Sequence, residues 1–377
     1  MKTKILIAGL LAVACGAWTG LRAQSASEAN SGGAEGATDV GKYANMDQLM
    51  NKQTGSMQFY GKVAMASGKL PWDPIPVVVT CDGKVRYNTA TDPKGGFYIV
   101  AAGRNSEVLT QKADPSHAAP AELVGCSVSA TVEGYQSTRL NIANRTLEDD
   151  PSLGTIVLTR DERSTGSVAS PTTDAAPPEA LKEFEKARSD DMDKHTSSAI
   201  HHLQKAVSLD PQFAEAWYHL GKLQETENQQ EALSDYQKAA AADPAYIPPY
   251  EPMAAIAALE KKWQAVVDAT SQALKMSPAG TPEIWYFNAV GNFNLGNRKQ
   301  AETSAETSLA MDPSHRAPNT EQLLAVILAS RGDYAAALDH LRHCLTYMPP
   351  GPNADLIRQQ VAQLEKIVPQ TAKSEAK

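Results

Sequence analysis

Five prolines stand at the ends of five similar sequence segments, here called phrases, in the second half of this 377-residue chain. The phrases are Leu-Asp-Pro211, Ala-Asp-Pro244, Met-Ser-Pro278, Met-Asp-Pro313 and Tyr-Met-Pro349. The prolines follow one another at intervals of about 34 residues, which indicates one supersecondary unit copied in series. Proline disfavours helix at its own position and at the residue before it, so each phrase predicts the end of a helix. An array of stacked helical units is therefore the first constraint on the fold.

Small and large apolar residues recur between these prolines. In the second phrase, Gly221 and Ala232 are small enough to let two helices approach closely. Leu220 and Tyr236 are large enough to fill the groove between the same helices. The order of aromatic, Leu-Gly, Ala, aromatic and Pro residues resembles the tetratricopeptide repeat. The resemblance implies five helix-turn-helix repeats over residues 179–368, in which neighbouring units share one core.

The array is expected to be irregular in its third unit and to end in a capping helix. Pro248, Pro249 and Pro252 should delay or distort the first helix of the third unit. Residues 353–368 carry one apolar face, which predicts a terminal helix that covers the last unit. That face consists of Leu356, Ile357, Val361, Leu364 and Ile367.

Short β-type runs replace the helical pattern upstream of the array. Strands are predicted at residues 57–63, 76–81, 84–88, 97–100, 126–132, 137–142 and 155–158. The dipeptide Asp82-Gly83 predicts a tight turn between the second and third strands. Such a series predicts an antiparallel β-sandwich over residues 56–160. The expected fold class is multi-domain, with this sandwich followed by an all-α helical-repeat solenoid.

A family resemblance supports the β-sandwich. The turn Thr91-Asp92-x-x-Gly95-Gly96-Phe97 and the later Gly134-Tyr135 resemble the carboxypeptidase regulatory-like (transthyretin-like) family, in its bacterial exported form. The resemblance implies an accessory module that has no catalytic residues of its own. Residues 105–120 depart from the compact pattern and predict a long loop.

Cysteine usage fits an oxidising compartment. Cys81 and Cys126 fall in the predicted β domain, whereas Cys344 lies far away in the array. We expect a disulfide between Cys81 and Cys126, which would close a loop of about 45 residues and stabilise the domain by about 3–4 kcal/mol. The alternative is a pair of buried thiols.

The N-terminus has the pattern of an export signal. Lys2 and Lys4 precede an apolar stretch at residues 5–18, and Ala23 is a small residue at a suitable cleavage position. A signal peptide is therefore predicted at residues 1–23, with a periplasmic or extracellular location. A retained anchor is one alternative. Another is lipidation at Cys15, because residues 11–16 resemble a bacterial lipoprotein box.

Three segments contain too little apolar surface to form a core. Residues 24–55 are predicted to be a disordered leader, 161–178 a linker and 369–377 a disordered tail. The formal net charge is −8, and cleavage after Ala23 would remove three basic residues and no acidic one. Attraction to nucleic acid is not expected from this charge, and contact with a membrane is expected only through a lipid on Cys15.

In an array of this kind, the first helices line a concave groove that can hold a peptide or a partner helix. We therefore expect a protein or peptide partner. The predicted lining combines aromatic, aliphatic and charged side chains: Glu215, Tyr218, Lys222, Glu225, Glu283, Tyr286, Val290, Phe293, Gln322 and Val326. The alternative is that its aromatic members pack only against neighbouring helices.

Motifs of known enzyme classes are missing from the sequence. It contains no serine-hydrolase elbow, no zinc-protease motif, no P-loop and no dinucleotide glycine set. The histidine pairs His201/His202 and His340/His343 fall on predicted solvent faces, so no metal site is expected there. We predict no cofactor and no enzymatic activity.

A non-enzymatic exported scaffold or adaptor is the leading hypothesis. The alternative is a carbohydrate- or cell-wall-binding accessory protein that uses the β-sandwich. Its candidate stacking residues are Trp72, Tyr87, Phe97, Tyr98 and Tyr135. A hydrolase built on unrecognised residues is a third hypothesis, and the oligomeric state stays open.

Overall fold

The computed structural model describes residues 57–66, 68, 72–101, 125–143, 149–161, 163–312 and 318–375. These residues belong to two compact units, and the boundary between the units in the sequence lies between Ala216 and Trp217. The N-terminal unit holds the strands and the first helices, and the C-terminal unit holds the remaining helices. The predicted signal peptide, the leader, Cys15 and the loop at residues 105–120 lie outside the described residues.

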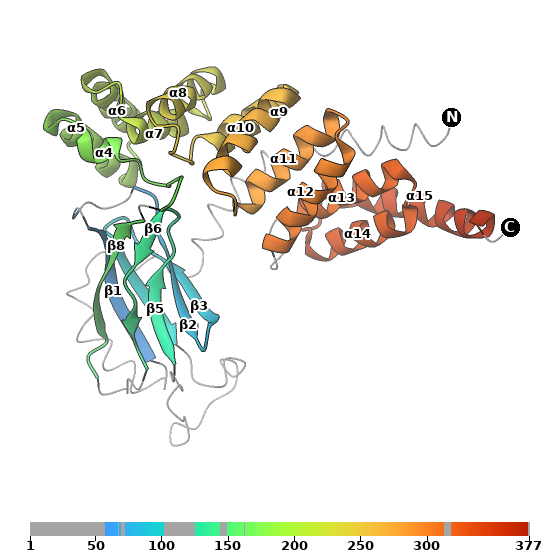
Figure 1. Ribbon diagram of the computed structural model, residues 1–377, viewed down its shortest axis with the longest axis horizontal. Coiled ribbons are helices and arrows are strands. Elements are labelled where there is room, and N and C mark those ends of the chain that lie inside the picture. Colours follow the sequence, from blue (N-terminus) through green and yellow to red (C-terminus); the bar gives the residue numbers. More distant parts are fainter. Residues whose placement is uncertain are drawn as a thin grey trace. The chain divides into compact units, whose positions relative to one another are not determined.

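Eight strands form the β domain in the described part of the N-terminal unit (Figure 1). They are β1 (Met57–Met65), β2 (Pro76–Cys81), β3 (Lys84–Ala90), β4 (Gly96–Ala101), β5 (Cys126–Ala130), β6 (Tyr135–Ser137), β7 (Leu140–Asn141) and β8 (Ser152–Arg160). One sheet has the order β4-β1-β8-β6 and the other β3-β2-β5-β7. The wholly antiparallel prediction is wrong at one place, since β1 and β8 pair in parallel.

Local turn chemistry fixes part of this topology. Asp82 and Gly83 have positive φ angles of 50° and 76°, and they join β2 to its antiparallel neighbour β3 as predicted. The single strand predicted at residues 137–142 is instead two short strands. β6 pairs with β8 in the first sheet, and β7 pairs with β5 in the second. The chain therefore crosses between the sheets at residues 138–139.

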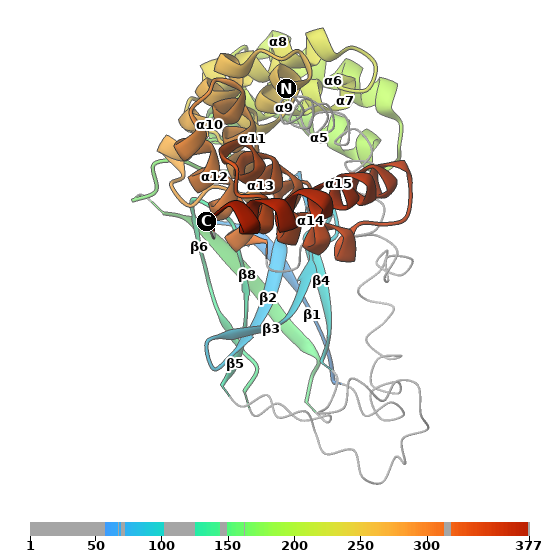
Figure 2. The same cartoon turned by 90° about the vertical axis from the view of Figure 1, so that its right-hand side faces the viewer.

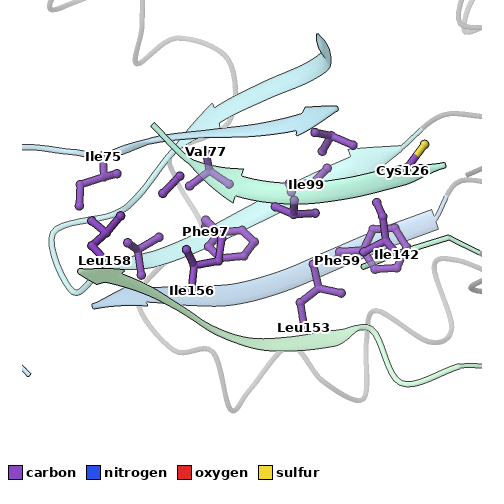
Figure 3. Packing of buried hydrophobic residues seen from close by; sticks show 14 of the residues in the cluster. Phe59, Ile75, Val77, Phe97, Ile99, Cys126, Ile142, Leu153, Ile156 and Leu158 are labelled. Atoms are coloured by element: carbon purple, nitrogen blue, oxygen red, sulfur yellow. The ribbon is translucent and has the colours of Figure 1, made fainter. Parts of the chain in front are cut away.

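Both sheets contribute side chains to one core (Figure 3). Phe59 and Ile156 come from the first sheet, and Val77 and Val128 come from the second, and all four are buried. A disulfide joins Cys81 on β2 to Cys126 on β5, which confirms the predicted pairing. Alternation along the strands explains this packing, because every second side chain of β2 and β5 points inward.

Helices make up the rest of the described structure (Figure 1). They are α4 (Thr172–Ala175), α5 (Pro178–Met192), α6 (Thr196–Leu209), α7 (Ala214–Gln224), α8 (Gln229–Ala242), α9 (Tyr250–Leu259), α10 (Trp263–Met276), α11 (Pro282–Asn294), α12 (Arg298–Met311), α13 (Pro318–Arg331), α14 (Tyr334–Tyr347) and α15 (Pro352–Glu375). Within the C-terminal unit, α9 packs on α10, α11 on α12, and α13 on α14, and neighbouring pairs also touch (Figure 2). The phrases of the sequence thus become consecutive helix pairs.

The phrase-ending prolines mark helix ends. Four of them are described, namely Pro211, Pro244, Pro278 and Pro349, while Pro313 is outside the described residues. Each of the four stands two positions after the last residue of α6, α8, α10 or α14. The residue in between is extended, with φ −139° and ψ 95° at Asp210 and φ −131° and ψ 91° at Ser277. This is the backbone that a following proline favours.

Irregular features of the array also follow from its residues. The proline-rich third phrase gives α9, which has only 10 residues and begins at Tyr250. At Gly221 of α7, an added Cβ would lie 3.0 Å from the Ala232 carbonyl oxygen and from the Tyr236 ring, so the small residue permits close helix contact. The terminal helix α15 continues to Glu375, beyond its predicted end at residue 368. Residues 369–375 are thus helical, although a tail was predicted there.

The segment predicted as a linker contains ordered structure. It includes α4, and the side chains of Ser167 and Ser170 are buried. The backbone N–H of Asp161 donates to the Gly134 carbonyl oxygen at 2.9 Å. Hydrogen bonds and close packing therefore compensate for the low apolar content from which the linker was predicted.

Candidate protein-binding surface

Helix α7 places three of the predicted groove residues around an aromatic cluster. The Tyr218 ring lies 5.8 Å from that of Tyr236 and 5.7 Å from that of Tyr246, measured between centroids. The Lys222 ammonium is exposed and 6.0 Å from the Tyr218 centroid, at the outer limit of a cation–π contact. Glu225 accepts a hydrogen bond of 2.7 Å from the Tyr236 hydroxyl. Tyr236 and Tyr246 are fully buried, so only the partly exposed Tyr218 ring is accessible here, with one basic and one acidic side chain close to the cluster.

Helix α11 contributes a more apolar part of the surface. Tyr286 and Val290 are buried in the core that α11 shares with its neighbours. Phe293 is half-buried, and the Arg298 guanidinium lies 5.9 Å from its ring centroid. Glu283, in the first turn of the helix, is also half-buried. Burial of Tyr286 and Val290 supports a packing role for these two residues.

On helix α13, Gln322 and Val326 are almost wholly buried, with 2% and 1% of their surface exposed. Val326 belongs to the apolar core that α13 shares with α14 and α15. The Nε2 atom of Gln322 makes no hydrogen bond within the described structure. A buried donor without an acceptor costs about 1–3 kcal/mol, so this amide is a local cost within the packed core.

Glu215, the first predicted groove residue, has a different environment from the other nine. Its Oε1 accepts a hydrogen bond of 2.7 Å from the backbone N–H of Ser170, in the segment before α4. By surface area the residue is only half-buried, but burial of its carboxyl group is the largest influence on its pKa, which is raised to about 7. Glu215 is thus held inside the N-terminal unit.

His201 and His343 are exposed, as the sequence had suggested, and His202 and His340 are half-buried, but three of these four histidines also contact buried carboxylates. The Nδ1 atoms of His340 and His343 each lie 2.5 Å from a different oxygen of the buried Glu321 carboxylate. In the first helix pair, His202 Nδ1 lies 2.6 Å from Glu183, which is also buried. In both helix pairs, one His follows the Glu by 19 residues, namely His202 after Glu183 and His340 after Glu321. These groups fasten the second helix of a pair to the first.

Hydrogen bonds and charges set the pKa values of the two buried glutamates. Lys186 and His202 hold the pKa of Glu183 well below its usual range. Burial raises the pKa of Glu321, but the hydrogen bonds from His340 and His343 outweigh it, so that this pKa is lowered. Both carboxylates are therefore ionised at neutral pH, and their histidine partners donate from Nδ1.

A buried polar network inside the array was not predicted. The Asn288 amide nitrogen donates to the Thr270 hydroxyl at 2.9 Å, and the Asn288 amide oxygen accepts from Ser304 at 2.8 Å. Asn292 donates to the same amide oxygen at 3.0 Å. The network links α10, α11 and α12 within the C-terminal unit. Its sequence signal is a polar residue at core positions of three consecutive helices.

Two features are absent from the residues that the structure describes. These residues contain no group of three or more His, Cys, Asp or Glu side chains arranged to hold a metal ion. Among the helices that the structure describes, none combines the length and the apolar character needed to cross a bilayer.

The aromatic residues proposed for carbohydrate stacking have other contacts. Phe97 is buried in the β core, and Tyr87 and Tyr135 pack against that core. The Trp72 ring lies 4.9 Å from that of Phe184, and its indole N–H donates to Asp191 at 3.1 Å. Tyr98 is exposed, with 42% of its surface accessible. These five residues do not form a shared stacking face.

Comparison with known proteins finds likeness at the level of fold. No family model matches the chain, and no curated protein sequence matches it. Among solved structures, YrrB, described as a TPR protein with an unusual peptide-binding site, is 17% identical over 48% of this chain and 92% of its own, with a TM-score of 0.43. A tetratricopeptide repeat protein from Parabacteroides merdae is 20% identical over 53% of this chain and 77% of its own, with a TM-score of 0.42. MamA from Desulfovibrio magneticus RS-1 is 13% identical over 45% and 96% of the two chains, with a TM-score of 0.41.

Proposed function

We propose that this chain is a non-enzymatic adaptor whose helical region binds another protein or a peptide. The observation that carries the proposal is that phrases of about 34 residues form the helix pairs α9–α10, α11–α12 and α13–α14 of the C-terminal unit, where neighbouring pairs touch and share buried apolar side chains. Repeat arrays of this kind gain stability from neighbour-to-neighbour contacts and present an extended surface along their first helices. We take the array to consist of five repeats and the terminal helix α15.

The accessible part of the predicted surface suits a peptide or a helix with apolar anchors. Tyr218 and Phe293 are partly exposed aromatic residues, and aromatic side chains often dominate the energetics of protein interfaces. Lys222 and Glu225 add both signs of charge near Tyr218, and Glu283 adds an acidic group in the first turn of α11. Such a mixture favours a partner that inserts apolar side chains and orients itself by rim charges.

Site-specific crosslinking in the native cell tests this proposal. A photoreactive amino acid placed at Tyr218 or at Phe293 should capture the same partner protein. The exposed Thr303 on α12, a second helix of a pair, is the matched control position and should not capture it. The purified partner should then bind at least about tenfold more weakly to the Tyr218→Ala variant, a loss of about 1.4 kcal/mol. Equal capture from all three positions would contradict the proposed surface.

We also propose that the protein is exported and that its β domain is an accessory sandwich module. The supporting observations are the charged and apolar pattern of residues 1–23 and the disulfide, since such bonds persist in oxidising compartments. Mass spectrometry of the protein from its native cell checks this directly. A chain that begins at Gln24 indicates cleavage, and a lipid on Cys15 indicates anchoring. An N-terminus that retains Met1 would argue against both.

A further inference from the structure

The segment 163–176, here called the connector, packs against one end of the β domain. The backbone N–H of Val168 donates to the Glu133 carbonyl oxygen at 3.4 Å. At Gly134, where φ is +80°, an added Cβ would stand 2.7 Å from the Gly166 carbonyl oxygen. This close approach of two backbones leaves no room for a side chain. The connector is thus fitted to the turn between β5 and β6.

The other side of the connector holds the beginning of α7. The Thr172 hydroxyl accepts a hydrogen bond of 3.1 Å from the backbone N–H of Ala214. One residue later, Glu215 accepts from the Ser170 N–H at 2.7 Å. The Glu215 carboxyl group therefore links the connector, and through it the β domain, to the helical part of the N-terminal unit.

Aromatic residues make a second, uncharged contact in the same unit. The ring of Phe184 on α5 lies 4.9 Å from that of Trp72, which precedes β2. It also lies 4.7 Å from the ring of Phe213, just before α7. Because these contacts do not depend on ionisation, they should persist when a charge appears on Glu215.

The groups around Glu215 disfavour a negative charge on it. Burial is the main cause that raises its pKa, and the carboxylates of Asp174 on α4 and Asp73 before β2 act in the same direction. Burial raises the pKa of Tyr135 on β6. The charge of Glu215 raises this pKa further, while Arg160 on β8 lowers it. The Ser170 N–H and the Thr173 hydroxyl favour the ionised form of Glu215 but do not offset these effects. No ion pair with a cation is formed by Glu215 in the described structure.

We propose that Glu215 is a proton-operated latch that fastens the connector to α7 when it is neutral and loosens this contact when it ionises. The neutral carboxyl group accepts from Ser170 without burying a charge among other acids. The ionised carboxylate is a stronger acceptor for the Ser170 N–H. It also places a buried negative charge, without a cation partner among the described residues, close to Asp174 and Asp73. The latch regulates the internal mobility of the N-terminal unit and does not depend on whether the array binds a partner.

The sign of the pH effect follows from the direction of the shift. Glu215 binds its proton more tightly in the folded state than in the unfolded state, where an ordinary Glu pKa applies. The stabilisation is therefore present at acidic pH and is lost as the pH rises through about 7. The connector should be most protected below neutral pH and least protected above it.

Hydrogen exchange of the full-length protein between pH 5.5 and 8.5 tests the latch. After correction for intrinsic rates, connector amides of the wild type should lose roughly tenfold or more in protection between pH 6 and 8. Glu215→Gln, which keeps a neutral acceptor, should remain protected throughout. Glu306→Gln, a change at an exposed residue of α12, should behave as the wild type. A flat wild-type profile, or the same loss in Glu215→Gln, would overturn the proposal.

A second variant keeps the test decisive if Glu215→Gln does not fold. Asp174→Asn removes one of the charges that raise the pKa of Glu215, at an exposed position of α4. Ionisation of Glu215 should then become easier, and the midpoint of the exchange transition should move to lower pH. An unchanged midpoint would show that Glu215 does not control the connector.

Discussion

Two glutamates of this protein show how the neighbours of a buried carboxyl group decide its chemistry. Glu321 receives hydrogen bonds from two imidazoles, and its pKa is lowered. Burial raises the pKa of Glu215 to about 7, and the nearby carboxylates of Asp174 and Asp73 add to this shift. The same residue type therefore stabilises one contact as an anion and the other as a neutral acid.

Replacement of Glu321 by Gln should destabilise the last helix pair. The change removes a buried charge to which His340 and His343 donate, and we expect a loss of about 1–3 kcal/mol at pH 7. Because the pKa of Glu321 is lowered, its contribution is present above pH ~4.5 and is lost as the pH falls through the folded-state value. Urea unfolding at pH 7 and at pH 3.5 should show a smaller difference between variant and wild type at the lower pH. An equal difference at both pH values would contradict this assignment.

Residue-scale prediction succeeded where the cause is local. Each phrase-ending proline restricts the backbone of the residue directly before it. The helix ends at Leu209 and Met276 could therefore be predicted from the sequence. Glu215 was not readable, because its partner Ser170 lies 45 residues away in a segment with little apolar content. The pairing of His340 with Glu321 depends on the rotation of two helices about their axes, which periodicity does not fix.

Pairs of elements are held together by features that the apolar pattern does not show. Asn288 joins α10 to α12 through Thr270 and Ser304 in an otherwise apolar core. Asn288→Ala should remove a hydrogen-bond partner from the Thr270 and Ser304 hydroxyls. We expect a loss of about 2 kcal/mol in the free energy of unfolding, measured by urea unfolding. Asn294→Ala, at an exposed site on the same helix, is the control and should cost less than about 0.5 kcal/mol. Similar losses in both variants would show that the network is not important.

The disulfide should dominate the stability of the β domain. Cys81→Ser with Cys126→Ser removes a bond between β2 and β5 and should lower the stability of the domain by about 4 kcal/mol.

Burial raises the pKa of Cys344 to about 12, so this thiol stays protonated and unreactive in the folded state and does not exchange with the disulfide. Near-ultraviolet spectroscopy during urea unfolding follows the loss. A reducing agent should shift the wild-type transition and leave that of the double variant unchanged, and a shift in both would point to another cause.

At the scale of the whole molecule, an array needs an end that closes its core. Ile357 and Leu364 of α15 are fully buried against α13 and α14. Deletion of residues 352–377 should expose that core, lower the melting temperature and increase binding of a hydrophobic dye. Deletion of residues 369–377 alone, which leaves both side chains in place, is the matched control. An unchanged melting temperature in the longer deletion would show that α15 does not cap the array.

The sequence predicted the order of a β domain and a helical region because both have short-range signals. It did not predict the parallel pairing of β1 with β8, because these strands are the first and last of the domain and their contact has no local signature. The ordered connector was missed for a related reason. Its stability comes from fit to Gly134 and Ala214, and neither contact appears in its own composition.

The bond between Cys81 and Cys126 turns 45 intervening peptide links into a closed covalent ring. A protease that cuts once anywhere within residues 82–125 opens this ring but does not divide the protein. Both products stay joined through sulfur, and the molecule should migrate as one chain until it is reduced. Such a nick would change the topology of the chain while leaving the β domain attached to its helices.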